Sequence, residues 1–245
     1  MQKLYKPHEV QRRIREIKVD ENEKKENISY KEVLFSKKYA RATFTGNMLS
    51  FFQQMTGINF IMFYSNTLFA DVGMPSSQVT GLVGVVNFVS TFGGLALVSK
   101  FGRRPILVYG AFAISVVLIL QGVFSLSNLN YLSITCTMLF IAFFEFSPGP
   151  LLFIYASEIM TDLGVSLALM INFLISLIVS IITPYLVKAI GEENIGWIFV
   201  VMGVVTFFSV IFEYKYVLET KGKTKQEIEF MFSDEPDKHL TMPQD

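Results

Sequence analysis

Long apolar stretches with few or no charged residues alternate along the chain with short polar or charged segments. A helix needs about 20 mostly apolar residues to cross a bilayer. Six stretches reach roughly this length: Ala42–Ala70, Ser77–Val98, Ile106–Phe124, Tyr131–Ser157, Leu163–Val187 and Gly196–Tyr216. The pattern predicts an all-α membrane protein with six transmembrane helices over residues 42–216.

Both ends of the chain are polar and charged. In the first segment, residues 1–41, apolar positions at helical spacing predict a short amphipathic helix near Pro7–Val19. The run DENEKKEN at residues 20–27 is interpreted as a solvated turn, and Tyr30–Phe35 is predicted to be a second short helix. We therefore expect a helical linker at 1–41 and a charged tail at 217–245.

Lys and Arg are concentrated in three segments: the N-terminal segment, the loop KFGRRP and the tail. Positive charge in short loops marks the cytoplasmic side of a membrane protein. An even number of spans places all three segments on one side. We therefore expect a multi-pass protein with both termini in the cytoplasm.

Composition narrows the function classes. Only 17% of the 245 residues are charged and the formal net charge is zero, which indicates no nucleic-acid partner. Cys136 is the single cysteine, so the chain cannot form an internal disulfide. The sequence shows no nucleophile–base pair and no metal-ligand cluster. We expect a protein that is not an enzyme and that needs no cofactor or metal.

The first predicted span has a polar middle, in the stretch FFQQMTGINFIMFY. Gln53, Gln54 and Asn59 are costly in hydrocarbon unless they find partners, so we expect them to face a wet cavity or other helices. An ideal helix cannot aim all three amides at one point. We predict a bend at Thr56-Gly57, because glycine tolerates unusual backbone angles. The alternative is a polar seam that only joins helices.

Glu145 lies in the fourth predicted span and is interpreted as the only acid deep in a span. An intramembrane carboxyl is by default a functional candidate. The following Pro148-Gly149-Pro150 is predicted to kink the helix and to free the carbonyls of Phe144 and Phe146. At helical spacing, Gly149 and Phe153 line the side of Glu145. The alternative is a neutral or hydroxyl-bonded acid that ties helices together.

The fifth predicted span carries a polar stripe at helical spacing: Asn172, Ser176, Ser180 and Thr183. It lines a pore in one interpretation. In the other, its hydroxyls bond their own helix or allow close packing of neighbours. The residues alone favour neither interpretation.

Several motifs, in order, resemble the sugar porters of the major facilitator superfamily. QQMTGIN with Tyr64-Ser65 resembles their seventh helix, FFEFSPGPLLF their tenth helix, and the G-R-R loop and E-T-K-G tail follow. In character the chain is similar to insect facilitated sugar and trehalose transporters. The resemblance implies the C-terminal six-helix half of that fold, in a plasma membrane.

The resemblance also implies site residues. In this family the two glutamines, the asparagine and the acid of the tenth helix contact sugar, which assigns that role to Gln53, Gln54, Asn59 and Glu145. Asn87 joins them through its spacing to Gly102, and Phe153 stands where Trp usually stacks on the sugar. Ser176-Leu177 replaces the usual Asn-Trp.

A cytoplasmic ion-pair latch is implied as well. In the family two arginines, here Arg103 and Arg104, bond an acid that matches Glu158. The usual acid at Ser99 and the usual arginine at Val165 are missing. Because these pairs hold the two transporter halves together, we expect a weaker latch.

We therefore predict a facilitative sugar transporter that works by alternating access. The sequence contains no counterpart of the six N-terminal helices. The expected partners are a hexose or trehalose-like sugar, the lipid bilayer, and an N-terminal transporter half or a second copy. The alternative is a non-transporting membrane protein that binds sugar or pairs with another transporter half.

Overall fold

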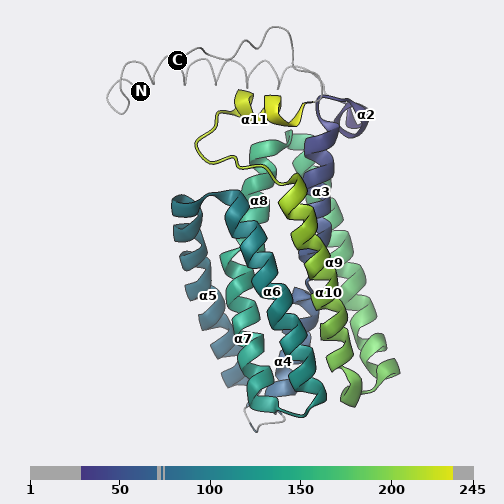
Figure 1. Cartoon of the computed structure of the whole chain (residues 1–245). Helices are drawn as coiled ribbons and strands as arrows, with labels where there is room; N and C mark the ends of the chain where they lie inside the picture. The colour runs from purple at the N-terminus through teal and green to yellow at the C-terminus, as the bar shows by residue number, and fades with distance from the viewer. Residues whose placement is uncertain (1–28, 71–72, 74, 234–245) are drawn as a thin grey trace.

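The computed structural model describes residues 29–70, 73 and 75–233, which form helices and short connections with no β-strand among them (Figure 1). The predicted helix Pro7–Val19 and the turn at 20–27 lie outside the described residues. The α-helices are α2 (Tyr30–Phe35), α3 (Ala40–Met55), α4 (Ile58–Ala70), α5 (Ser76–Phe101), α6 (Arg103–Leu126), α7 (Asn130–Phe146), α8 (Pro148–Ile159), α9 (Asp162–Ile190), α10 (Gly196–Tyr216) and α11 (Lys225–Phe232). A 3₁₀ turn, Glu192–Asn194, links α9 to α10.

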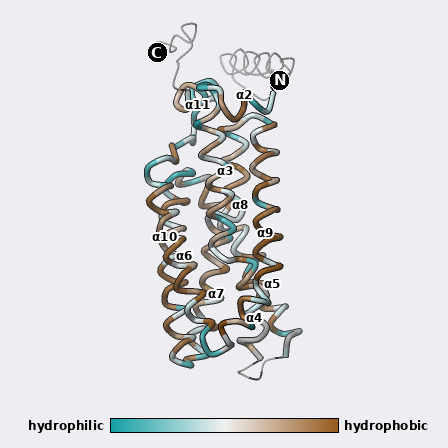
Figure 2. Tube along the Cα trace, turned by 90° about the vertical axis from the view of Figure 1, so that its right-hand side faces the viewer, coloured by the Kyte–Doolittle hydropathy of each residue, from teal (hydrophilic) through white to brown (hydrophobic). Residues whose placement is uncertain are grey.

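The long helices run side by side in one bundle, and the short helices α2 and α11 lie at one of its ends (Figure 1). We call this the basic end, because it carries Lys38, Arg103 and Arg104. Hydrophobic residues continue along the outside of α9 and α10 (Figure 2). On α9, Phe173 is 67% exposed and Leu177 is 57% exposed. Such a surface suits hydrocarbon rather than water.

Five helical segments of the described chain are long and apolar enough to cross a membrane. They are Ser77–Val98, Arg103–Leu126, Asn130–Ile159, Asp162–Ile190 and Gly196–Tyr216. These correspond to the last five predicted spans. The predicted short helix at Tyr30–Phe35 is confirmed with the same bounds.

The first predicted span is not one helix but two, because the chain breaks where the bend is predicted. The two parts, α3 and α4, have 16 and 13 residues and follow one another down the bundle (Figure 1). Gly57 separates them with a positive φ of 81°, which side chains other than glycine rarely adopt. A Cβ at this position would also lie 2.3 Å from the sulfur of Met202.

A second break separates α7 from α8 at Ser147, whose φ and ψ are −127° and −96°. The kink predicted from Pro148 and Pro150 is therefore confirmed. The carbonyl of Phe144 is not left free, however, because it accepts a hydrogen bond from the Ser147 N–H at 3.3 Å. The Ser147 hydroxyl donates to the Ile106 carbonyl at 2.8 Å and ties the break to α6.

Small residues let α6 and α10 pack closely. A Cβ at Gly122 would lie 2.6 Å from the carbonyl oxygen of Gly196. The Ser115 hydroxyl donates to the carbonyl of Gly203 at 2.8 Å, a further direct link between the two helices. Close backbone approach at small residues is a common way of joining helices in a membrane.

We predict that Gly122→Ala destabilises the bundle, by about 1–3 kcal/mol, because the added methyl group forces α6 and α10 apart. Gly81→Ala on α5 is the matched control, since a Cβ there meets nothing within 4 Å. Both variants gain the same intrinsic helix propensity. Thermal unfolding in detergent measures the difference. Equal melting temperatures for the two variants would contradict the close packing.

Candidate functional site

Three amides of the broken first span meet two polar residues of α9. The Asn172 side chain donates to Gln53 Oε1 at 2.6 Å and accepts from Gln54 Nε2 at 2.9 Å. The Asn59 amide donates to Gln54 Oε1 at 2.9 Å and to the Ser176 hydroxyl at 2.8 Å. We call these five residues the amide cluster.

The break at Gly57 explains how the cluster forms. Gln53 and Gln54 lie in the last turn of α3 and Asn59 lies in the first turn of α4. The changed chain direction between them lets Asn59 reach back to Gln54. Asn172 is 3% exposed and occupies the space between the two glutamines. The sequence alone did not select it as a site residue, although its spacing to Ser176 marks one face of α9. Thr183, lower on the same stripe, bonds the Val179 carbonyl of its own helix.

The glutamine at position 53 also joins the amide cluster to the second break. Its Nε2 donates to the carbonyls of Pro148 and Gly149 at 2.7 and 3.3 Å. These two carbonyls lie just after the helix break, and the Gln53 amide directs its two N–H groups to them. This pairing satisfies polar groups that would otherwise be buried without partners.

Glu145 forms a separate group with two residues of α5. Its Oε1 accepts from the Asn87 amide at 2.8 Å. The Thr91 hydroxyl lies 2.9 Å from both Glu145 Oε2 and the Asn87 carbonyl and, having one hydrogen, donates to one of them at a time. The close approach of α5 and α7 depends on Gly94, where a Cβ would lie 2.5 Å from the Glu145 carbonyl oxygen. We call Asn87, Thr91 and Glu145 the carboxyl cluster.

The two clusters approach each other at Gly149. The carbonyl of this residue accepts from Gln53, and a Cβ on it would lie 3.4 Å from Glu145 Oε2. Five of the six predicted sugar contacts, Gln53, Gln54, Asn59, Asn87 and Glu145, thus gather around the second break. The sixth, Phe153 on α8, is 41% exposed and forms no ring stack within the described part of the chain. The sugar-binding role of all six residues stays a prediction.

At the basic end the two arginines go to different partners. Arg103 Nη2 lies 2.6 Å from Glu158 Oε1, and Arg103 Nε donates to the same carboxylate. The Arg104 guanidinium instead donates to the Tyr214 carbonyl at 2.8 Å and lies over the Tyr214 ring. The expectation that both arginines bond Glu158 is therefore wrong for Arg104. The Thr220 hydroxyl supplies another donor to Glu158, at 2.6 Å.

A second carboxylate, Glu219, caps the start of α6. It accepts from the backbone N–H groups of Arg103, Arg104 and Lys221 at 2.9 to 3.1 Å. Burial acts to raise the pKa of Glu219, but these donors and the charge of Arg103 outweigh it and lower the pKa. Gly102 leaves room for this cap, because a Cβ there would lie 2.7 Å from the carboxylate.

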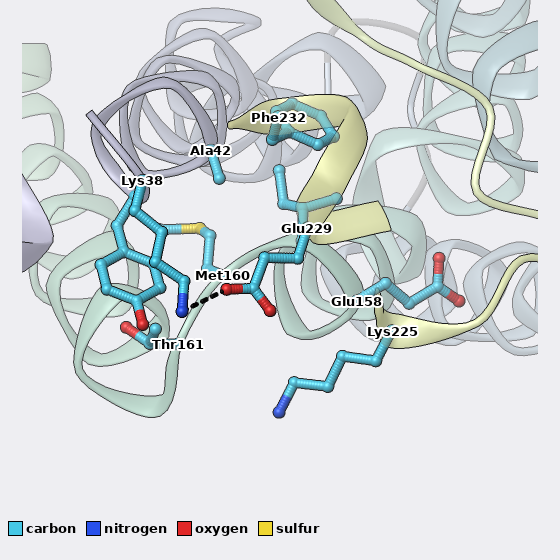
Figure 3. A pocket seen from close by; sticks show the side chains of 10 residues that line it. Lys38, Ala42, Glu158, Met160, Thr161, Lys225, Glu229 and Phe232 are labelled. Atoms are coloured by element: carbon cyan, nitrogen blue, oxygen red, sulfur yellow. Dashed lines mark ion pairs between the residues drawn. The ribbon is translucent and has the colours of Figure 1, made fainter. Parts of the chain in front are cut away.

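A second ion pair, made by a third carboxylate, joins α11 to the segment before α3. Lys38 Nζ lies 2.7 Å from Glu229 Oε1, in a pocket that Glu158, Thr161 and Phe232 also line (Figure 3). Partial burial acts to lower the pKa of Lys38, but the hydrogen bond and charge of Glu229 outweigh it and raise the pKa. The basic end is thus held by three separate carboxylates.

The sequence from residue 1 to 232 matches the family described as "Sugar (and other) transporter". The chain belongs to this family. Among curated relatives, it is 33% identical over 195 residues to the facilitated trehalose transporter Tret1 of Drosophila erecta, covering 74% of the chain and 22% of that protein. It is 35% identical over 235 residues to solute carrier family 2, facilitated glucose transporter member 2, of Gallus gallus, covering 89% of the chain and 43% of that protein.

Solved transporter structures share the fold. The proton:xylose symporter XylE bound to 6-bromo-6-deoxy-D-glucose is 27% identical, with a TM-score of 0.70. The match covers 78% of this chain and 42% of the symporter chain. The partially occluded, inward-open XylE from E. coli gives a TM-score of 0.64 at 27% identity, covering 79% and 43%. The chain spans less than half the length of each of these relatives.

These matches confirm the predicted family and the fold class. The chain has part of the major facilitator fold, and its apolar helices make it a multi-pass membrane protein. The relatives are transporters rather than enzymes.

We predict that Glu219→Gln lowers the melting temperature at pH 7, because a neutral amide replaces the carboxylate that holds the start of α6. A depressed pKa gives stability that is present above the ordinary value of 4.5 and lost as the pH falls through the lower folded value. The difference between wild type and variant should therefore shrink below about pH 4.5. The exposed Glu193, in the turn after α9, provides the control Glu193→Gln. A constant difference at every pH would contradict the capping role.

Proposed function

We propose that this chain forms the sugar-binding half of a facilitative transporter for a hexose or a trehalose-like sugar. Gln53, Gln54 and Asn59 of the amide cluster bind sugar hydroxyls, together with Asn87 and Glu145. Phe153 supplies an apolar wall. The observation that carries the proposal is the convergence of these amides on a broken helix inside a membrane bundle.

Amides suit this task because each one donates and accepts hydrogen bonds, as a sugar hydroxyl does. In the amide cluster, Gln54 bonds both Asn59 and Asn172, and Asn59 also bonds Ser176. A bound sugar exchanges amide–amide bonds for amide–hydroxyl bonds, so little hydrogen-bonding energy is lost when the site empties. Such a balance favours release as well as binding.

Alternating access follows from the position of the site. In transporters with two repeated halves, the substrate site lies near the midplane between the halves, which rock around it. We propose that this chain acts with an N-terminal half or a second copy, in a plasma membrane with both termini in the cytoplasm. The Arg103–Glu158 pair then forms the cytoplasmic latch.

A second candidate is a non-transporting membrane protein that binds sugar or pairs with another transporter half. It is favoured by the uncharged residues at two usual latch positions, Ser99 and Val165. A latch with fewer partners holds one state less firmly and makes alternation less effective.

We predict that Gln54→Leu weakens sugar binding by about 1–3 kcal/mol, because it removes the partner of the buried Asn172 side-chain oxygen and one of the two partners of the Asn59 amide. The measurement is binding of radiolabelled D-glucose and trehalose to a protein that joins this chain to a complete N-terminal half. Gln121→Leu is the matched control, since Gln121 is 1% exposed on α6 and lies outside the amide cluster. Wild-type binding by a correctly folded Gln54→Leu protein would reduce the amide cluster to a packing seam.

We also predict that the 245-residue chain, purified alone, inserts into proteoliposomes without saturable sugar uptake. The site lies at the interface between halves, so one half leaves it without its second wall. Co-reconstitution with an N-terminal half should restore uptake. Saturable uptake by the chain alone would make it a self-sufficient transporter, and binding without uptake in the joined protein would favour the second candidate.

A further inference from the structure

A second carboxyl, besides Glu145, is buried inside the bundle. Glu213 lies in the span formed by α10 and is only 4% exposed, so Glu145 is not the only acid within a span. No hydrogen bond or ion pair reaches Glu213 Oε2 from the described residues. An unpaired buried carboxyl is costly in a protein interior and more so in a membrane, so its presence requires a physical explanation.

Glu213 lines a small cavity between α3, α6, α8 and α10. The cavity has room for about one water molecule. Its polar lining consists of Gln53, Thr56, Ser209 and Glu213, and the remaining wall is mostly aliphatic. Gln53 therefore belongs both to this cavity and to the amide cluster.

The hydrogen-bond donors of this lining are already used. The hydroxyl of Thr56 donates to the Gln53 carbonyl at 2.6 Å, and that of Ser209 donates to the Thr206 carbonyl at 2.7 Å. Both N–H groups of the Gln53 amide are directed to the carbonyls at the second break. The cavity thus presents the Glu213 carboxyl and two hydroxyl oxygens as acceptors, without a protein donor to match them.

Neighbouring charges do not fill this need. Apart from Glu213 itself, the charged groups on the four helices around the cavity are absent from its lining. Several of them have other partners: Arg41 lies over the Phe232 ring, Arg103 bonds Glu158, Arg104 bonds the Tyr214 carbonyl and Lys215 lies over the Tyr216 ring. The tyrosines of the same helices, Tyr109, Tyr155, Tyr214 and Tyr216, are also absent from the lining.

A metal ion suits the cavity poorly. Calcium takes six to eight oxygen ligands, and even magnesium requires a nearly ideal octahedron. The lining offers one carboxyl and two hydroxyl oxygens in space for a single water. Within the described residues, no group of three or more acidic, His or Cys side chains could hold a metal. A proton, by contrast, needs one acceptor and supplies the missing donor.

We propose that Glu213 is a proton-binding site, at which the carboxyl stays neutral and donates its hydrogen bond to a water molecule in this cavity. The acid loses its proton when α3 and α10 separate and water enters. Gln53 lines the cavity and also belongs to the amide cluster. A separation of α3 from α10 therefore changes the surroundings of the proton site and of the amide cluster together. The proposal goes beyond sugar binding and holds whatever the cargo is.

Infrared spectroscopy of the purified full chain at neutral pH tests the protonation directly. We expect a carboxylic C=O stretch that shifts in D₂O and disappears in Glu213→Gln. The same band should persist in Glu145→Gln, the matched change at the other intramembrane acid. A spectrum of Glu213→Gln that retains every carboxylic band would overturn the proposal.

Stability against pH provides a second, independent test. The unfolded chain releases the proton of Glu213 near the ordinary glutamate value of about 4.3, whereas the folded chain keeps it. Stability conferred by the bound proton is therefore lost as the pH rises. We expect the ratio of the unfolding equilibrium constants, wild type over Glu213→Gln, to rise about tenfold per pH unit above pH 5. Parallel profiles for the two proteins would contradict the proposal.

A second variant and a comparison of two salts complete the stability test. If Glu213→Gln does not fold, Glu213→Met, an apolar replacement of similar length, serves as the pH-insensitive reference. Stabilisation of wild type by sodium chloride, but not by choline chloride, would show a cation site and overturn the proton assignment. None of these measurements uses sugar, so failure of the proton site is distinguishable from failure of the transport proposal.

Discussion

The structure depends on one constraint: several amides have to be satisfied inside an apolar bundle. An unpaired amide in such surroundings costs a few kcal/mol, and the first span alone carries three. The chain meets this cost by breaking that span at Gly57 and by placing Asn172 of α9 between Gln53 and Gln54. The bonds of Asn172 tie α9 to α3, and the break lets Asn59 of α4 join the same cluster.

The hydrophobic pattern predicts most of this fold, because the element type follows from long uncharged stretches. The bounds of α10 and of α2 match the predicted ranges, and both helix breaks fall at their predicted glycine or proline motifs. These successes are local in origin. A glycine or a proline limits the backbone of its own turn, so the sequence around it carries the information.

Pairing between helices is what the sequence could not supply. Periodicity places Asn172 and Ser176 on one face of α9 but does not say which helix meets that face. The same limit applies to Arg104, whose partner is the Tyr214 carbonyl rather than Glu158. It applies most strongly to Glu213, which lies near the end of the sixth predicted span, next to the charged tail, and which the sequence analysis did not select. Only the packing of α3 and α6 against α10 makes it a buried acid.

The helix α8 connects the two functional regions mechanically. Its first residue, Pro148, accepts a hydrogen bond from Gln53 of the amide cluster, while Glu158 near its other end holds Arg103 at the basic end. With 12 residues it spans about 18 Å, and a helix of this length moves nearly as a rigid rod. A single helix thus contacts both the ion pair at the basic end and the glutamine of the amide cluster.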